Sequence, residues 1–155
     1  MEEVKVVERD TTQYVVVRLG EEKFGVDIKY IDNIVRMQPM TRVPKAQEYI
    51  KGVINLRGEV VPVMSIRIKM HLPEDEITKA SRIIILKLEQ YGTIGILVDE
   101  VVEVVTIDNT LVEKITYDMN DETEVFISGI GKNGNDLISL LDFNLVMQEK
   151  EKENA

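Results

Sequence analysis

The chain has 155 residues, of which 28 are acidic and 19 basic, and 44% are hydrophobic. That hydrophobic fraction is typical of a globular protein and too high for a disordered one. The formal net charge of −9 disfavours binding to phosphate backbones, and without cysteine the chain has no disulfides or thiolate metal sites. The longest purely aliphatic run, 83–86, has four residues, and the start does not resemble a signal peptide. We therefore expect a cytoplasmic protein without direct membrane insertion.

The sequence contains an internal repeat. The matched segments keep their order along the chain, and their offset grows from 69 to 70 and then 77: 14–19 with 83–88, 24–26 with 94–96, and 49–53 with 126–130. Self-similarity of this kind indicates duplication of one structural unit.

Each half is predicted to be mainly β. Residues 15–19 and 83–88 are β-branched runs that end in turn-forming residues, which is typical of hairpins. Residues 26–35 are compatible with a strand or a helical turn, because isoleucine recurs there every third position. A second hairpin is expected over 52–66, with its turn at 57–59.

The expected boundaries follow from the polar, proline-containing stretch at 71–76. We expect a first β-barrel over 12–72 and a second over 80–148, which together form one domain. The second includes a C-terminal helix that begins after Asp142 as its N-cap. The polar residues 149–155 are expected to be a disordered tail. Barrels of this size are marginal alone, so we expect them to share an apolar interface.

No residue pattern predicts catalysis, a metal site or a cofactor. Residues 129–134 fit G-x-G-x-x-G, but they lead into an expected strand rather than a helix and are interpreted as a hairpin turn. The acidic segment 118–122 lacks the glycine and glutamate of a calcium loop, and His71 is the only histidine. We therefore expect a protein that is not an enzyme.

The tip of the hairpin at 52–66 differs from its counterpart in the second half. Arg57 stands where the repeat has Gly134. As a solvated turn residue, Arg57 needs no partner. Alternatively, its planar guanidinium anchors a partner or bridges the two halves through a carboxylate. The residues themselves leave both interpretations open.

Residues 52–63, GVINLRGEVVPV, closely resemble the G-x-x-N-L-R-G-x-x-x-P-[VI] core of the CheW family, the coupling proteins of bacterial chemotaxis. The resemblance extends over about 13–147 and includes 24–28, the approach at 43–52, and 95–101. It implies two tandem SH3-like five-stranded barrels. It also implies a non-enzymatic adaptor that docks the regulatory domain of a CheA-type histidine kinase onto the cytoplasmic tip of methyl-accepting receptors.

The resemblance also implies positions for these contacts. The helical hairpin of the receptor would lie in an apolar groove between the barrels, formed by Ile28, Ile31, Ile34, Gly52, Asn55, Leu56, Arg57 and Gly58. Inter-barrel support would come from Asn33 and Arg57, and the kinase would meet a hydrophobic face of the second barrel. The protein would be cytoplasmic and recruited to membrane receptor arrays through protein contacts, without a cofactor or metal.

Two positions depart from the family pattern, which often has an acidic residue at Asn33 and Asp-Leu-Arg where this chain has Ser65-Ile66-Arg67. Two alternatives remain at this stage. One is a CheW-like scaffold of a sensory array that does not serve chemotaxis. The other is a β-barrel that binds nucleic acid, which is disfavoured by the negative charge and by only three Phe and five Tyr for base stacking.

Overall fold

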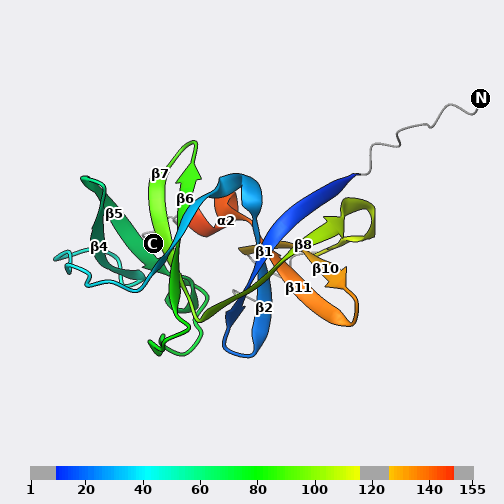
Figure 1. The fold of residues 1–155 in the computed structure, drawn as a ribbon, viewed down its shortest axis with the longest axis horizontal. Coiled ribbons are helices and arrows are strands. Elements are labelled where there is room, and N and C mark those ends of the chain that lie inside the picture. The colour runs from blue at the N-terminus through cyan, green and yellow to red at the C-terminus, as the bar shows by residue number, and fades with distance from the viewer. Residues whose placement is uncertain (1–9, 116–125, 149–155) are drawn as a thin grey trace, which may run out of the picture.

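The computed structural model describes residues 10–115 and 126–148, in which the chain forms two curled β-sheets side by side (Figure 1). The strands are β1 Thr11–Leu19, β2 Glu22–Asp27, β3 Ile31–Arg36, β4 Ile50–Leu56, β5 Glu59–Ser65, β6 Arg82–Leu88, β7 Gly92–Val98, β8 Glu100–Asp108, β9 Glu113–Lys114, β10 Ile127–Asn133 and β11 Asp136–Leu141. The helices are short: 3₁₀ turns η1 Ile28–Tyr30 and η2 Asn109–Leu111, and α-helices α1 Ile66–Lys69 and α2 Phe143–Met147. None of the described helices is long and apolar enough to cross a membrane.

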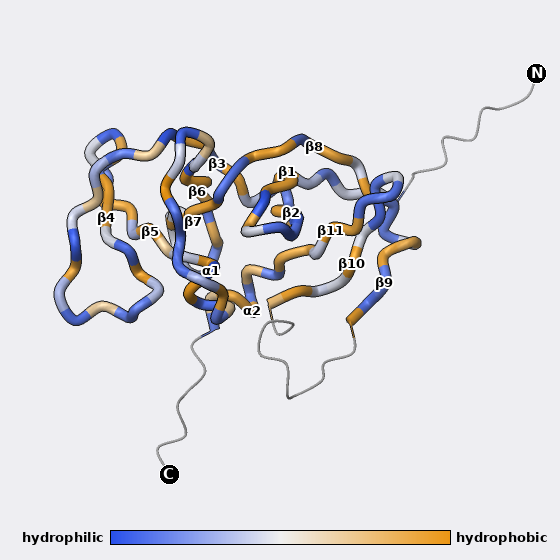
Figure 2. Tube along the Cα trace, turned by 90° about the horizontal axis from the view of Figure 1, so that it is seen from below, coloured by the Kyte–Doolittle hydropathy of each residue, from blue (hydrophilic) through white to orange (hydrophobic). Residues whose placement is uncertain are grey.

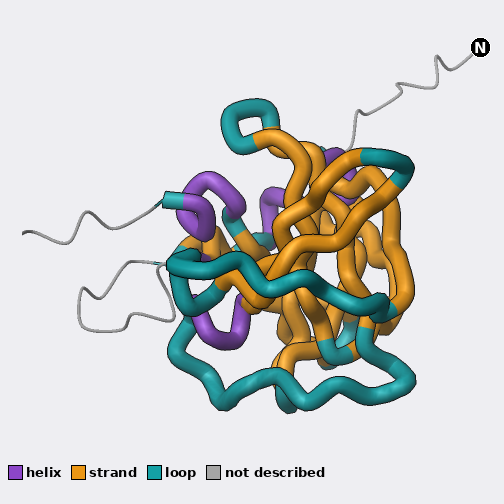
Figure 3. Tube along the Cα trace, turned by 90° about the vertical axis from the view of Figure 1, so that its left-hand side faces the viewer, coloured by secondary structure: helices purple, strands orange, loops and turns teal. Residues whose placement is uncertain are grey.

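One sheet has six strands in the order β8-β1-β2-β11-β10-β9, and the other has five in the order β3-β6-β7-β5-β4. The five-stranded sheet is built from one stretch of chain, 31–98, and is called the continuous sheet here. The six-stranded sheet takes its strands from 11–27 and 100–141 and is called the split sheet. The connection 37–49 runs across the end of the molecule that carries β4 and β5 (Figures 1 and 3).

The sheets do not follow the division into 12–72 and 80–148 that chain order suggests. The β1–β2 hairpin pairs with β8 and β11 of the second half, and the β6–β7 hairpin pairs with β3 and β5 of the first. The exchange is reciprocal, because Gly25 pairs with Leu140 in one sheet as Gly95 pairs with Val63 in the other. Nearest-neighbour pairing along the chain, the usual rule, therefore gives the wrong membership for both hairpins.

The predicted elements are otherwise present. The hairpin expected over 52–66 is β4–β5, and the ambiguous segment 26–35 contains both a 3₁₀ turn and strand β3. Asp142 is the N-cap of α2, where its Oδ1 accepts hydrogen bonds from the backbone N–H groups of Asn144 and Leu145 at 2.9 and 3.3 Å. The glycines at 129–134, interpreted as a hairpin turn, belong to the β10–β11 hairpin, but Gly129 and Gly131 lie within strand β10 and only Gly134 is in the turn. The expected tail 149–155 and the acidic segment 118–122 lie outside the described residues.

The core has three parts, and strand alternation determines which side chain enters which part. On β1 and on β6, alternate residues face a large core shared by the two sheets, and the residues between them face the interior of one sheet. Figure 2 shows the hydrophobic stretches that run along the strands of both sheets. The shared core receives Val15, Val17 and Leu19 from β1 and Ile84, Leu86 and Leu88 from β6. These residues are matched by the repeat, and α2 fills the same core with Phe143 and Val146. The expected apolar interface between the two units is therefore present.

Candidate functional site

The tip of the β4–β5 hairpin is a two-residue turn, Arg57-Gly58. Leu56 pairs with Glu59, and the φ angles of the two turn residues are 50° and 81°. This is the geometry of a type I′ turn, which matches the twist of a hairpin but requires positive φ at both positions. The Asn55 Oδ1 accepts a hydrogen bond from the Gly58 N–H at 3.1 Å, which stabilises the turn.

The matching turn in the split sheet has glycine at its first position but is of a different type, since its second residue, Asn135, does not have positive φ. Asn133 pairs with Asp136, and Gly134 has a φ of 61°. An arginine in the left-handed region costs about 1–2 kcal/mol relative to an ordinary conformation. Residues held in this region often cluster at functional sites, although Lys45 and His71 also have positive φ in this chain. Strain at Arg57, where glycine would be unstrained, points to a role for the side chain beyond closing the turn.

Arg57 lies at the open end of the continuous sheet, beside a cavity of about 130 Å³. The cavity is lined by Asp32, Asn33, Leu56, Arg57, Glu59, Val61, Ile85, Lys87 and Thr93. Lys87 and Asp32 form an ion pair across it, with Nζ and Oδ1 3.4 Å apart. The Arg57 side chain is exposed, and the described part of the chain supplies it with no hydrogen bond or ion pair. Its guanidinium is therefore available to a carboxylate from another molecule.

The predicted groove residues do not form a single surface. Asn33, Leu56 and Arg57 share the cavity, whereas Ile34 lies on the other face of β3 and is 37% exposed. Ile28 lies on η1, where the chain passes from the split to the continuous sheet, and it is 41% exposed. The predicted groove residues are thus divided between the cavity beside Arg57 and the opposite, outer face of the continuous sheet.

Two further predicted positions serve the framework instead. Ile31 packs against the shared core. Gly52 is buried at an irregularity in the β4–β5 pairing, and a Cβ there would lie 2.7 Å from the Thr41 carbonyl oxygen. Close approach of the backbone, rather than contact with a partner, therefore requires glycine at this position.

The assignment of Asn33 and Arg57 as inter-barrel support is corrected by their location. Both residues belong to the continuous sheet, so a contact between them would not join the two sheets. The Asn33 Oδ1 accepts a hydrogen bond from the backbone N–H of Ile34 at 2.9 Å. The polar connection between the sheets is made elsewhere, by residues whose role the sequence did not predict.

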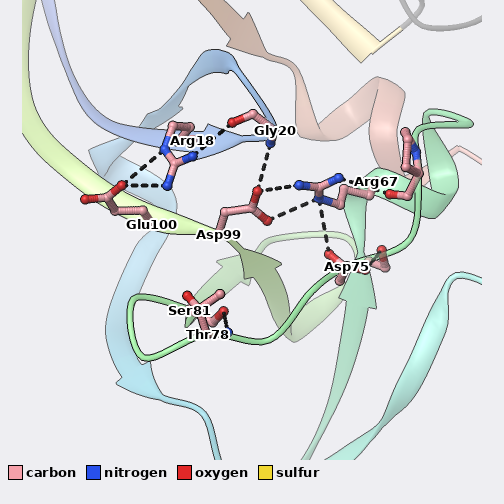
Figure 4. A network of polar contacts seen from close by, with 10 residues as sticks. Arg18, Gly20, Arg67, Asp75, Thr78, Ser81, Asp99 and Glu100 are labelled. Carbon is pink, nitrogen blue, oxygen red and sulfur yellow. Dashed lines mark hydrogen bonds and ion pairs between the residues drawn. The ribbon is translucent and has the colours of Figure 1, made fainter.

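Asp99, in the link between β7 and β8, is the centre of that connection (Figure 4). Its carboxylate accepts hydrogen bonds from Arg67 Nε at 3.1 Å and from Arg67 Nη2, and from the Gly20 N–H at 2.8 Å. Arg67 belongs to α1, next to the continuous sheet, and Gly20 to the β1–β2 turn of the split sheet. A second ion pair, Arg18 Nη2 to Glu100 Oε2 at 2.8 Å, lies beside it.

The electrostatics of this network are those of a largely buried ion pair. The Arg67 and Asp99 side chains are 12% and 15% exposed. Burial alone would raise the pKa of Asp99, but the hydrogen bonds from Arg67 and Gly20 and the arginine's charge outweigh it, and the pKa is lowered. The hydrogen bond to Asp99 in turn raises the pKa of Arg67. Both groups are thus held in their charged forms.

Ser65, which stands where the family pattern has Asp, is compensated by Asp75, a residue that the sequence did not predict to have a role. The Ser65 Oγ accepts a hydrogen bond from the Ile68 N–H at 3.1 Å, which caps α1, and donates one to Asp75 Oδ2. The Asp75 side chain is 3% exposed, with Oδ1 3.9 Å from Arg67 Nε. At the matching position of the second half, Asp142 caps α2 with its own carboxylate. Asp75 therefore supplies the carboxylate that Ser65 lacks.

Comparison with known proteins identifies the family to which this fold and these residues belong. The model of the CheW-like domain matches residues 13–151. The chain belongs to the CheW-like domain family. It is similar to the chemotaxis protein CheW of Bacillus subtilis, with 34% identity over 91% of this chain and 90% of that protein. The chemotaxis protein CheW of Treponema pallidum is 27% identical over 90% of this chain and 84% of that protein.

A solved structure is similar over almost the whole CheW-like chain. It is the crystal structure of the scaffolding protein TtCheW from Thermoanaerobacter tengcongensis, with a TM-score of 0.81 and 28% sequence identity. The match covers 99% of this chain and 97% of that one. The prediction of a mainly β fold of two SH3-like barrels is thereby confirmed, although each barrel here takes strands from both halves of the chain.

Proposed function

We propose that this chain is a non-enzymatic adaptor that couples methyl-accepting chemoreceptors to a CheA-type histidine kinase. The observation that carries the proposal is Arg57, an exposed arginine held at positive φ beside a charged cavity. Membership of the CheW-like family supports it, as do the names of the relatives, which favour chemotaxis over another array-based pathway.

The receptor would bind along the continuous sheet and its entry from η1. Recognition of a helix by a groove uses apolar anchors together with charged groups at the rim that set its register. Ile28 and Ile34 are exposed apolar side chains on this path, and Arg57 offers a planar fork for a carboxylate. The tip of a receptor's cytoplasmic helical hairpin would therefore have to present an apolar residue and a carboxylate on one side.

The regulatory domain of the kinase would bind the split sheet, which contains most of the second half. Exposed apolar side chains lie on two of its strands, at Val104 and Leu137, and on the adjoining turn η2, at Leu111; they are 56%, 60% and 71% exposed. Separate surfaces for receptor and kinase allow both to be bound together, which coupling requires. An adaptor of this kind works in the cytoplasm, is recruited to the membrane by protein contacts, and needs no cofactor, metal or nucleic acid.

Co-sedimentation tests the proposal. Membranes that contain the receptors of the same cell are mixed with the kinase, with and without this chain. We expect the kinase to pellet with the membranes only when the chain is present, in an amount that saturates as the chain is added. Equal pelleting of the kinase with and without the chain would contradict coupling.

A further inference from the structure

Two arginines stand directly opposite each other at one end of the continuous sheet. Arg36 pairs with Arg82 across the antiparallel strands β3 and β6. Directly opposed residues point to the same face, and like charges in that arrangement repel each other. Arg82 Nη1 donates hydrogen bonds to the carbonyl oxygens of Lys79 and Ser81, both at 2.8 Å, and Arg36 is exposed.

These two charges are not balanced by the rest of the described structure. The carboxylates within 10–115 and 126–148 form no ion pair with either guanidinium: Asp32 pairs with Lys87, and Asp75 and Asp99 face Arg67. The composition of the continuous sheet adds to this unbalanced positive charge, since 31–98 contains ten basic and seven acidic residues. The remaining residues contain nine basic and twenty-one acidic ones. An acidic protein thus has a basic sheet, whose field attracts anionic groups.

The arginine pair is continuous with the exposed apolar surface of β3. Arg36 lies two residues after Ile34, so both side chains are on the same outer face. Two residues along a strand span about 6.8 Å. One turn of an α-helix rises about 5.4 Å. A helix whose apolar residue covers Ile34 would therefore place a side chain three or four positions away close to Arg36.

Building on the proposed function, we propose that Arg36 and Arg82 bind a carboxylate of the receptor helix and so fix its register on β3. Each guanidinium fork fits a carboxylate, and one anion between the two arginines removes the repulsion that they have in the free chain. The receptor segment recognised would have Asp or Glu three or four residues from the apolar residue that contacts Ile34. Because Arg36 and Arg82 repel each other in the free chain, they do not stabilise the fold. Their proposed role is to select the helix that binds.

Titration of a receptor-tip fragment against the full chain tests the assignment. In Arg36→Glu we expect the affinity to fall at least tenfold. The matched control is Arg42→Glu, which makes the same charge change at an exposed position of the connection 37–49, and there we expect less than a twofold change. The melting temperature of Arg36→Glu should not fall, because the new carboxylate faces Arg82. Substituting the fragment's acidic residues by Lys one at a time should identify one that restores binding to Arg36→Glu.

The outcomes separate this inference from the proposed function. Unchanged affinity in Arg36→Glu, with binding by the unaltered chain intact, would overturn the carboxylate contact alone. Failure of the unaltered chain to bind the fragment would count against the proposed receptor contact itself. Retention of single-stranded DNA by the unaltered chain, lost in Arg36→Glu, would overturn the inference in favour of a phosphate ligand.

Discussion

At position 57 the backbone conformation favours glycine, whereas the proposed contact with a partner needs the arginine side chain. The type I′ turn favours glycine, and the second half of the chain has one at the matching position. The difference between the two repeats at this residue is visible in the amino-acid sequence alone. The positive φ of Arg57 gives that difference a physical meaning, because glycine would adopt it without strain.

The substitution Arg57→Gly separates the strain of the turn from the contact made by the side chain. Removing the side chain relieves the strained φ, so we expect the melting temperature to stay the same or rise slightly. Receptor-fragment affinity should weaken by about 2 kcal/mol, as for an interface anchor. The control is Lys132→Ala, which removes an exposed cation from the corresponding hairpin of the split sheet. If calorimetry gives the same affinity for Arg57→Gly as for the unaltered chain, the anchor role is wrong.

Asp99 links the stability of the protein to pH. Its pKa in the folded chain is below the ordinary value of 3.8. The folded state therefore favours the carboxylate, and the stabilisation is complete above about pH 5 and lost as pH falls through 3.8 toward the lower folded pKa. Asp99→Asn removes the charge of the carboxylate hydrogen-bonded to the largely buried Arg67 and leaves only that of Asp75, 3.9 Å away, which costs about 3 kcal/mol at neutral pH.

We expect the free energies of unfolding of Asp99→Asn and the unaltered chain to converge as pH falls from about 5 to about 2. Urea unfolding at each pH measures the difference. A difference that stays constant over this range would show that the charge of Asp99 contributes nothing.

At the scale of single elements, the repeat predicted the hairpins well but not their partners. The alternation on β1 and β6 buries the same two faces whichever half each hairpin joins. Local pattern therefore cannot distinguish a hairpin packed on its own half from one exchanged with the other half. Asp75 was missed for a related reason: it lies in an irregular connection, and only long-range packing brings it to Ser65.

The Ser65–Asp75 pair predicts a coupled pair of substitutions. Ser65→Asp restores the residue of the second half and of the family pattern, but it places two carboxylates together in a buried site. We expect a loss of about 2–3 kcal/mol of stability, since a buried charge without a partner is costly. Adding Asp75→Asn should recover more than half of it. Urea unfolding of the four proteins gives the coupling energy, and strictly additive effects would rule out the compensation.

For the molecule as a whole, the shared core makes the two sheets depend on each other. Two SH3-like barrels with a common apolar interface were predicted from the repeat and the size of each unit. The continuous sheet is one stretch of chain, yet its Met64, Ile84, Leu86 and Ile96 are buried in the shared core. Separated from the split sheet, it would expose all four.

We therefore expect the whole chain to unfold in one transition, whether followed by circular dichroism or by tyrosine fluorescence. A fragment of residues 31–98 should show no cooperative transition, because it loses the shared core. A fragment that melts cooperatively would mean that the core between the sheets is not required for either one.

Coupling of receptor and kinase through separate faces is the central claim, and calorimetric titration tests it most directly. The regulatory domain of the CheA-type kinase from the same cell is titrated into this chain, free and then saturated with the receptor-tip fragment. We predict 1:1 binding with similar affinity in both titrations, retained in Arg57→Gly and lost when Val104, Leu111 and Leu137 are replaced by polar residues. No binding at concentrations of about 100 μM, or displacement of one partner by the other, would contradict it.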